Sequence, residues 1–123
     1  MENINVDYES IVLNTMNPKG YFKTYKVLVK KLEDFCTAGL LCELISKYDF
    51  YKDKGQLKED KWFFYTRNDI QRDFFFSEYQ QREMLKKLEK EGLVVTTVFP
   101  NTIPQRKYYT LDFKKIVDYI SGK

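Results

Sequence analysis

Residues 63–95 have the sequence FFYTRNDIQRDFFFSEYQQREMLKKLEKEGLVV, which predicts two helices joined by a very short turn. Thr66 and Ser77 each stand where a helix N-cap would, followed three residues later by a side chain that can close a capping box. The first helix is expected over residues 67–74. The second follows Ser77 and ends at Gly92, because glycine adopts the left-handed conformation of a helix C-terminus at low cost.

The flanking segments complete one domain that is α+β and mostly helical. Apolar periodicity and β-branched runs predict a short basic helix ending at Leu32, a long helix over 33–52, a strand over 62–65, a hairpin of strands over 93–99 and 106–112, and a last helix capped by Asp112. This is the order of a winged helix-turn-helix with a long N-terminal helix, a two-stranded wing and a C-terminal helix. Residues 1–20 are expected to form an arm or strand, with the winged-helix domain over 21–123.

The composition is that of a single folded domain. The 123 residues, 43% of them apolar, suffice for one core and are too few for two ordinary domains. Ten Tyr and ten Phe argue against disorder, because aromatic side chains bury much surface. The 21 Lys and Arg against 18 Asp and Glu leave a net charge of only +3, so any basic surface must come from local placement.

Several functional classes are excluded or disfavoured by residue type. The absence of histidine removes Ser-His-Asp, Cys-His and zinc-hydrolase chemistries, and no carboxylate spacing resembles a calcium loop. We therefore expect a protein that is not an enzyme, with no catalytic residue, metal or cofactor. A stretch of about 20 apolar residues, as a membrane span needs, is missing, and so is a secretory signal, which favours the cytoplasm. Cys36 and Cys42, on different faces of the long helix, are expected to be buried thiols without a disulfide.

The second helix of the turn pair is the candidate DNA-reading element, because in winged helices this helix enters the major groove. Helical geometry places Gln81, Met84, Leu85 and Leu88 on an inward side, and Tyr79, Arg82, Glu83, Lys86 and Lys90 on the opposite, exposed side. Arg82 can grip guanine through two hydrogen bonds, and Tyr79, Gln80 and Lys86 are further candidate contacts. The alternative is a solvated face on which Glu83 pairs with Lys86 or Lys87.

The hairpin supplies a second set of candidate contacts. Its polar tip holds residues that can reach the minor groove or phosphates, namely Asn101, Thr102, Gln105, Arg106 and Lys107. The alternative is an ordinary polar hairpin tip. A cluster of Lys23, Lys26, Lys30 and Lys31 either adds phosphate contacts or serves solubility.

Residues 63–95, continuing to RKYYTLD at 106–112, resemble the winged-helix N-terminal domain of phage and plasmid replication initiator (replisome organiser) proteins. The resemblance covers roughly residues 20–112. It is carried by Thr66 and Ser77 opening the two helices, by the Leu-x-x-x-Gly-Leu-Val exit that begins at Leu88, and by the Tyr-Tyr-x-Leu that begins at Tyr108. It implies that the chain binds double-stranded DNA at origin repeats, alongside host or phage replication proteins.

Two positions depart from that family's pattern. Phe75 lies in the turn where winged helices usually have glycine, and a bulky residue at positive φ is costly. Gln81 stands where an inward aliphatic residue is usual, and a buried amide must find hydrogen-bond partners. Together with Glu78 and Glu83 they favour an alternative, a small phage-encoded regulator or inhibitor that binds a host protein. A transcription repressor is a third interpretation, favoured if the last helix forms a homodimer.

Overall fold

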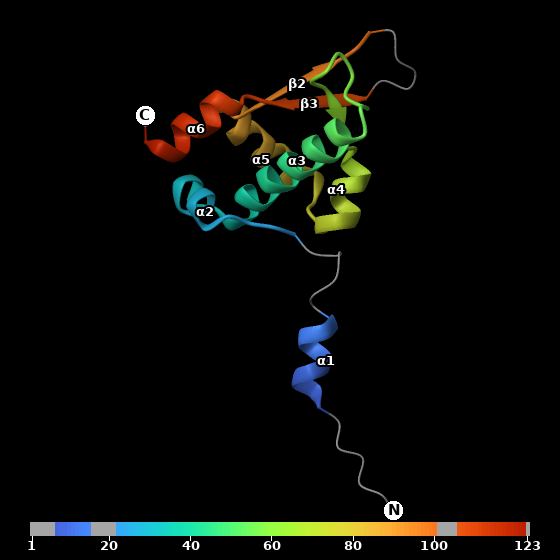
Figure 1. The fold of residues 1–123 in the computed structure, drawn as a ribbon. Coiled ribbons are helices and arrows are strands. Elements are labelled where there is room, and N and C mark those ends of the chain that lie inside the picture. The colour runs from blue at the N-terminus through green and yellow to red at the C-terminus, as the bar shows by residue number, and fades with distance from the viewer. Residues whose placement is uncertain (1–6, 16–21, 101–105, 123) are drawn as a thin grey trace, which may run out of the picture.

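Six helices and a three-stranded sheet make up the described part of the chain, which is residues 7–15, 22–100 and 106–122 of a computed structural model (Figure 1). In chain order they are α1 (Tyr8–Thr15), α2 (Lys26–Leu32), α3 (Phe35–Asp53), β1 (Phe63–Phe64), α4 (Arg67–Phe74), α5 (Glu78–Lys90), β2 (Val94–Val98), β3 (Lys107–Leu111) and α6 (Phe113–Ser121). The fold is therefore α+β and mostly helical, as the sequence predicts.

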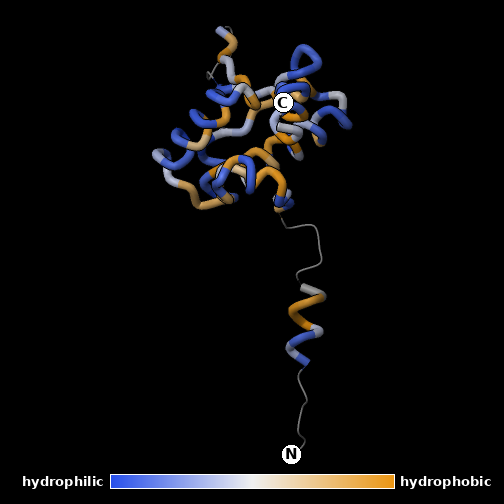
Figure 2. The backbone as a smooth tube through the Cα atoms, turned by 90° about the vertical axis from the view of Figure 1, so that its left-hand side faces the viewer, coloured by the Kyte–Doolittle hydropathy of each residue, from blue (hydrophilic) through white to orange (hydrophobic). Residues whose placement is uncertain are grey.

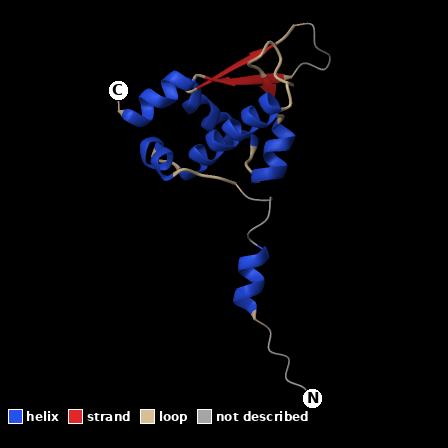
Figure 3. Ribbon diagram, in the orientation of Figure 1, coloured by secondary structure: helices blue, strands red, loops and turns tan. Residues whose placement is uncertain are grey.

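The sheet is antiparallel, with the strand order β1-β3-β2. In the β2–β3 hairpin Val94 pairs with Leu111 and Val98 with Lys107, so the two predicted strands are confirmed, each one residue shorter at either end than predicted. The two-residue β1 pairs with the edge of β3 that faces away from β2, with Phe63 opposite Tyr109. Figure 3 shows the sheet along one side of the helices.

The core is built around α3. Leu40, Leu41 and Leu44 of this helix are fully buried, and α3 contacts α2, α5 and β1. The side of α5 that faces the core contributes Leu88, and the sheet contributes Tyr109. Because α5 also contacts β2 and α4, its orientation is fixed by three neighbouring elements.

The last helix is anchored at both ends. Asp112 accepts a hydrogen bond from the backbone N–H of Lys115 at 3.0 Å, which confirms the predicted N-cap. Ile116 is buried and the Tyr119 hydroxyl donates to the carbonyl of Lys31, which joins α6 to α2. Val117 of the same helix is exposed.

Two sequence-based expectations are corrected. Of the arm or strand expected over residues 1–20, the strand is wrong: residues 8–15 form a helix, because the Asp7 carboxylate accepts from the N–H of Ser10 and the Asp7 carbonyl accepts from the N–H of Ile11. Figure 2 shows hydrophobic residues along this α1, and its Val12 and Leu13 are exposed.

Both cysteines were expected to be buried, and only one of them is. Both are free, but Cys42 is buried whereas Cys36 is exposed. Cys36 is the second residue of α3, where the chain still lies at the surface next to its N-cap, Asp34.

Candidate nucleic-acid interface

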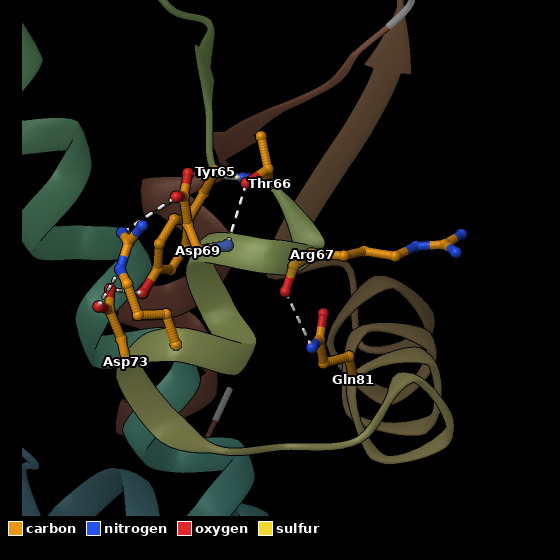
Figure 4. A network of polar contacts seen from close by, with 7 residues as sticks. Tyr65, Thr66, Arg67, Asp69, Asp73 and Gln81 are labelled. Atoms are coloured by element: carbon orange, nitrogen blue, oxygen red, sulfur yellow. Dashed lines mark hydrogen bonds and ion pairs between the residues drawn. The ribbon is translucent and has the colours of Figure 1, made fainter.

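The α4–α5 pair is positioned by two capping boxes, of which Figure 4 shows that of Thr66 and Asp69. The Thr66 hydroxyl accepts from the N–H of Asp69 at 3.0 Å, and the Asp69 carboxylate accepts from the N–H of Thr66 at 3.4 Å. Ser77 and Gln80 make the equivalent pair at 3.1 and 2.9 Å. Both predicted helix starts are thereby confirmed, and the Gln80 side-chain oxygen is occupied by the cap of its own helix.

The turn between the two helices holds Phe75 in the left-handed conformation, at φ 60° and ψ 24°. Its N–H donates to the Gln71 carbonyl at 2.7 Å, so it ends α4 in the way glycine usually does. The Phe75 side chain is 85% exposed, whereas the rings of Phe74 and Phe76 on either side stack on each other at 4.9 Å. Phe75 therefore does adopt the positive φ that is costly for a bulky residue, and the turn is not reshaped to avoid this strain.

Gln81 is buried and ties the two helices together. Its side-chain amide nitrogen donates to the carbonyl of Phe76 at 3.0 Å and to the carbonyl of Arg67 at 3.2 Å (Figure 4). The amide oxygen has no hydrogen-bond partner within the described residues. The unusual amide thus satisfies two backbone carbonyls of α4 and its turn, and leaves one acceptor unpaired.

The two faces of α5 are as predicted. Gln81, Met84, Leu85 and Leu88 are buried, and Tyr79, Arg82, Glu83, Lys86 and Lys90 are exposed. Arg82 lies over the Tyr79 ring at 5.8 Å. The Lys87 ammonium donates to the Leu32 carbonyl, so this lysine is held against α2 and is not available to pair with Glu83.

A groove of about 620 Å³ runs between α5 and the hairpin, which we call the α5–hairpin groove. Its lining includes five basic side chains, from Arg67, Arg82, Lys86, Arg106 and Lys107, and two carboxylates, from Glu78 and Glu89. Its floor is formed by buried side chains that include Leu85 and Tyr109. The groove therefore combines a rigid apolar floor with an excess of positive charge along its walls.

The charged groups in this groove have specific neighbours. The Arg67 guanidinium pairs with the Glu78 carboxylate at 2.9 Å, and Arg106 lies over the Phe64 ring at 4.7 Å. The Thr96 hydroxyl donates to the Glu89 carboxylate. No ion pair to Arg82, Lys86 or Lys107 occurs within residues 7–15, 22–100 and 106–122.

Burial and hydrogen bonding shift several pKa values beside the groove. Burial raises the pKa of Tyr109, on the groove floor, to about 12, so its hydroxyl stays protonated. Burial and a 2.6 Å hydrogen bond to Asp73 raise the pKa of Tyr65. The hydrogen bond from Thr66 lowers the pKa of Asp69, which keeps the α4 capping box ionised.

The sequence-predicted contacts divide into three groups. Arg82, Lys86, Arg106 and Lys107 come together in the groove. Tyr79 and Gln80 are exposed on α5 but do not line it. Asn101, Thr102 and Gln105 lie outside the described residues.

Lys23, Lys26, Lys30 and Lys31 are exposed around α2 and do not line the groove either.

Arg67 is the groove residue that sequence reasoning missed. It is the first residue of α4, directly after the Thr66 N-cap, and so belongs to neither the exposed face of α5 nor the hairpin. The capping box predicts where α4 begins, but it does not place that end of α4 beside α5, so the sequence held no signal that Arg67 lines the groove.

Other kinds of site are not found in the part of the chain that the structure describes. No cluster of three or more His, Cys, Asp or Glu there could hold a metal ion. None of the helices described has the length and apolar character needed to cross a membrane. A scan against protein-family models finds no match, and searches of curated proteins and of solved structures find none either.

Proposed function

We propose that this chain is a winged-helix protein that binds double-stranded DNA without turnover, and that it acts in replication initiation at a phage or plasmid origin. The α5–hairpin groove supports this most directly, since five basic side chains from α4, α5 and the β3 end converge on it despite a chain net charge of only +3. The order of elements and the strand order β1-β3-β2 support the proposal of a recognition helix flanked by a wing.

In the proposed complex α5 enters the major groove with its exposed face. Arg82 contacts base edges from the middle of that face, and Lys86 one turn further on contacts a phosphate. Arg106 and Lys107, at the start of β3, contact the neighbouring backbone as the wing. Tyr79 and the side-chain amide nitrogen of Gln80 contribute from the first turn of α5. The role in replication rests on the sequence resemblance to initiator domains.

Selection of bound duplexes from a random library is the first test, because it yields either a sequence motif or nothing. With the selected duplex in hand, we expect Arg82→Ala to weaken its binding by about tenfold, the effect of losing a bidentate guanine contact, and to weaken binding to random duplex much less.

Arg72→Ala is the matched control for this substitution. Arg72 is an exposed arginine on α4 that pairs with Asp69 and Asp73 and does not line the groove. Its removal should leave the ratio of specific to random binding unchanged. Equal losses for both duplexes in Arg82→Ala would show that Arg82 does not read bases.

A second candidate function is favoured by the 85% exposure of Phe75. Phe75 is an exposed phenylalanine in a costly backbone conformation, three residues before Glu78 in the sequence, and such a residue suits a surface that binds a protein. The partner would be a host factor that a phage regulator inhibits. We expect such a partner to stay bound after nuclease treatment and to be lost on Phe75→Ser. A transcription repressor is distinguished by dimerisation, for which the exposed Phe113 and Val117 of α6 offer a surface, and which sedimentation would detect.

A further inference from the structure

We propose that Arg67 contacts a DNA phosphate in the α5–hairpin groove, and that in the free protein Glu78 holds its guanidinium until a phosphate replaces the carboxylate. Glu78 would thus lower the affinity for any phosphate backbone. This inference rests on the proposed DNA binding. It adds a phosphate contact by Arg67 and its weakening by Glu78, neither of which the sequence indicated.

The backbone of Arg67 is fixed while its side chain is not. The Thr66 capping box sets the start of α4, and the Gln81 amide nitrogen holds the Arg67 carbonyl at 3.2 Å. The Arg67 side chain is 69% exposed, and Figure 4 shows it extended away from the body of α4 on the side of α5. A long cationic side chain on a rigid base can change partners without moving either helix.

The Glu78 carboxylate is the partner present in the free protein. It lies at the first position of α5, 2.9 Å from the Arg67 guanidinium, and both residues line the groove. The Glu78 side chain is 71% exposed, and exposed ion pairs contribute little net free energy. The Glu78 carboxylate is bound through one guanidinium nitrogen, whereas a phosphate offers arginine two parallel charge-assisted hydrogen bonds, so the exchange is favourable.

The other carboxylate of the groove differs from Glu78. Glu89 accepts from the Thr96 hydroxyl and has no basic partner in the described residues. Glu78 alone is therefore placed both to occupy an arginine of the groove and to repel a phosphate that approaches it. This double effect predicts that the contributions of Arg67 and Glu78 to DNA affinity depend on each other.

A double-mutant cycle tests the dependence. Wild type, Glu78→Gln, Arg67→Gln and the double variant are titrated with a fluorescent random-sequence duplex, and binding is followed by anisotropy at fixed low salt. We expect Glu78→Gln to tighten binding and Arg67→Gln to weaken it, each by about threefold, in line with an exposed ion pair worth less than a tenfold effect. In the Arg67→Gln background, the gain from Glu78→Gln should fall to less than half.

Glu91→Gln is the matched control. It removes one negative charge from the exposed C-cap of the same helix, about 20 Å from Glu78 by helical rise, and should leave affinity nearly unchanged. A gain equal to that of Glu78→Gln would show that net charge alone is responsible. An undiminished gain in the Arg67→Gln background would also overturn the proposal.

The same data separate this inference from the function on which it rests. If wild type binds the duplex and Arg67→Gln binds equally well, the phosphate contact is wrong and the DNA-binding proposal stands. If folded wild type, checked by circular dichroism, binds no duplex at low salt, the proposed function fails and the Arg67 contact fails with it.

Discussion

Gln81 illustrates how a residue that looks out of place can organise a site. Helical spacing was enough to predict that it points inward, and the structure confirms this. Its partners could not be predicted, because the carbonyls of Arg67 and Phe76 become neighbours only when the turn closes. The same turn brings Arg67 into the groove, so missing the turn geometry also meant missing that residue.

Phe75 is a second residue whose cost was predictable and whose environment was not. A non-glycine residue in the left-handed region is strained by about 1 to 2 kcal/mol, and the 85% exposure of the ring leaves little burial to offset it. We expect Phe75→Gly to raise the free energy of unfolding by about 1 kcal/mol, after the entropy that glycine adds to the unfolded chain. Urea denaturation measures the difference.

Phe35→Gly provides the control for that substitution. Phe35 is also exposed, at 66%, but it starts α3 and is not among the residues with positive φ. Glycine there should lower stability by about 0.5 to 1 kcal/mol. A loss of stability in Phe75→Gly as well would mean that the ring makes contacts worth more than the strain.

Among single elements, the sequence predicted helix starts and ends best, because a cap is recognised from a few neighbouring residues. Thr66, Ser77 and Asp112 each start a helix as expected, and Gly92, at φ 76°, follows the end of α5. The helix over 8–15 was missed because its local cap, Asp7, precedes a segment without a clear apolar stripe.

The capping box of α4 makes the stability of this element depend on pH. The hydrogen bond from Thr66 lowers the pKa of Asp69 in the folded state below its unfolded value. The corresponding stabilisation is therefore present above the unfolded carboxyl pKa of about 4 and is lost as the pH falls through the lowered folded value. Asp69→Asn removes this contribution at every pH.

We therefore expect the difference in stability between wild type and Asp69→Asn to be larger at neutral pH than well below pH 4. Urea denaturation of both proteins at several pH values measures it. Because the pKa of Asp34 is lowered as well, the wild type loses some stability in acid for another reason, which the difference between the two proteins cancels. A difference independent of pH would contradict the role of the Asp69 carboxylate.

For the whole molecule, the order of helices and strands after α1 followed from the sequence, but the groove did not. The groove needs the residues at the start of β3 to lie near α5, and no local pattern encodes this arrangement of two separate parts of the chain. Four of its five basic residues had been singled out separately, on the helix and on the hairpin. Their convergence is what the three-dimensional structure adds.

Because these cations are gathered in one groove, we expect the affinity for DNA to depend strongly on salt concentration, although the net charge of the chain is small. If about four phosphates are neutralised in the groove, the logarithm of the affinity for random duplex should fall against the logarithm of salt concentration with a slope of about −4. Anisotropy titrations over a range of salt concentrations measure this slope. A slope near zero would contradict binding through the groove.

The link that Gln81 makes between α4 and α5 has a mechanical consequence. The Gln81 amide nitrogen bonds to the carbonyl of Arg67 at the start of α4 and to that of Phe76 in the turn, and α5 also contacts α3 and β2, so the two helices are held against each other. A duplex docking on α5 would meet a surface that is already set, so the ordering entropy lost on association would come from a few long arginine and lysine side chains.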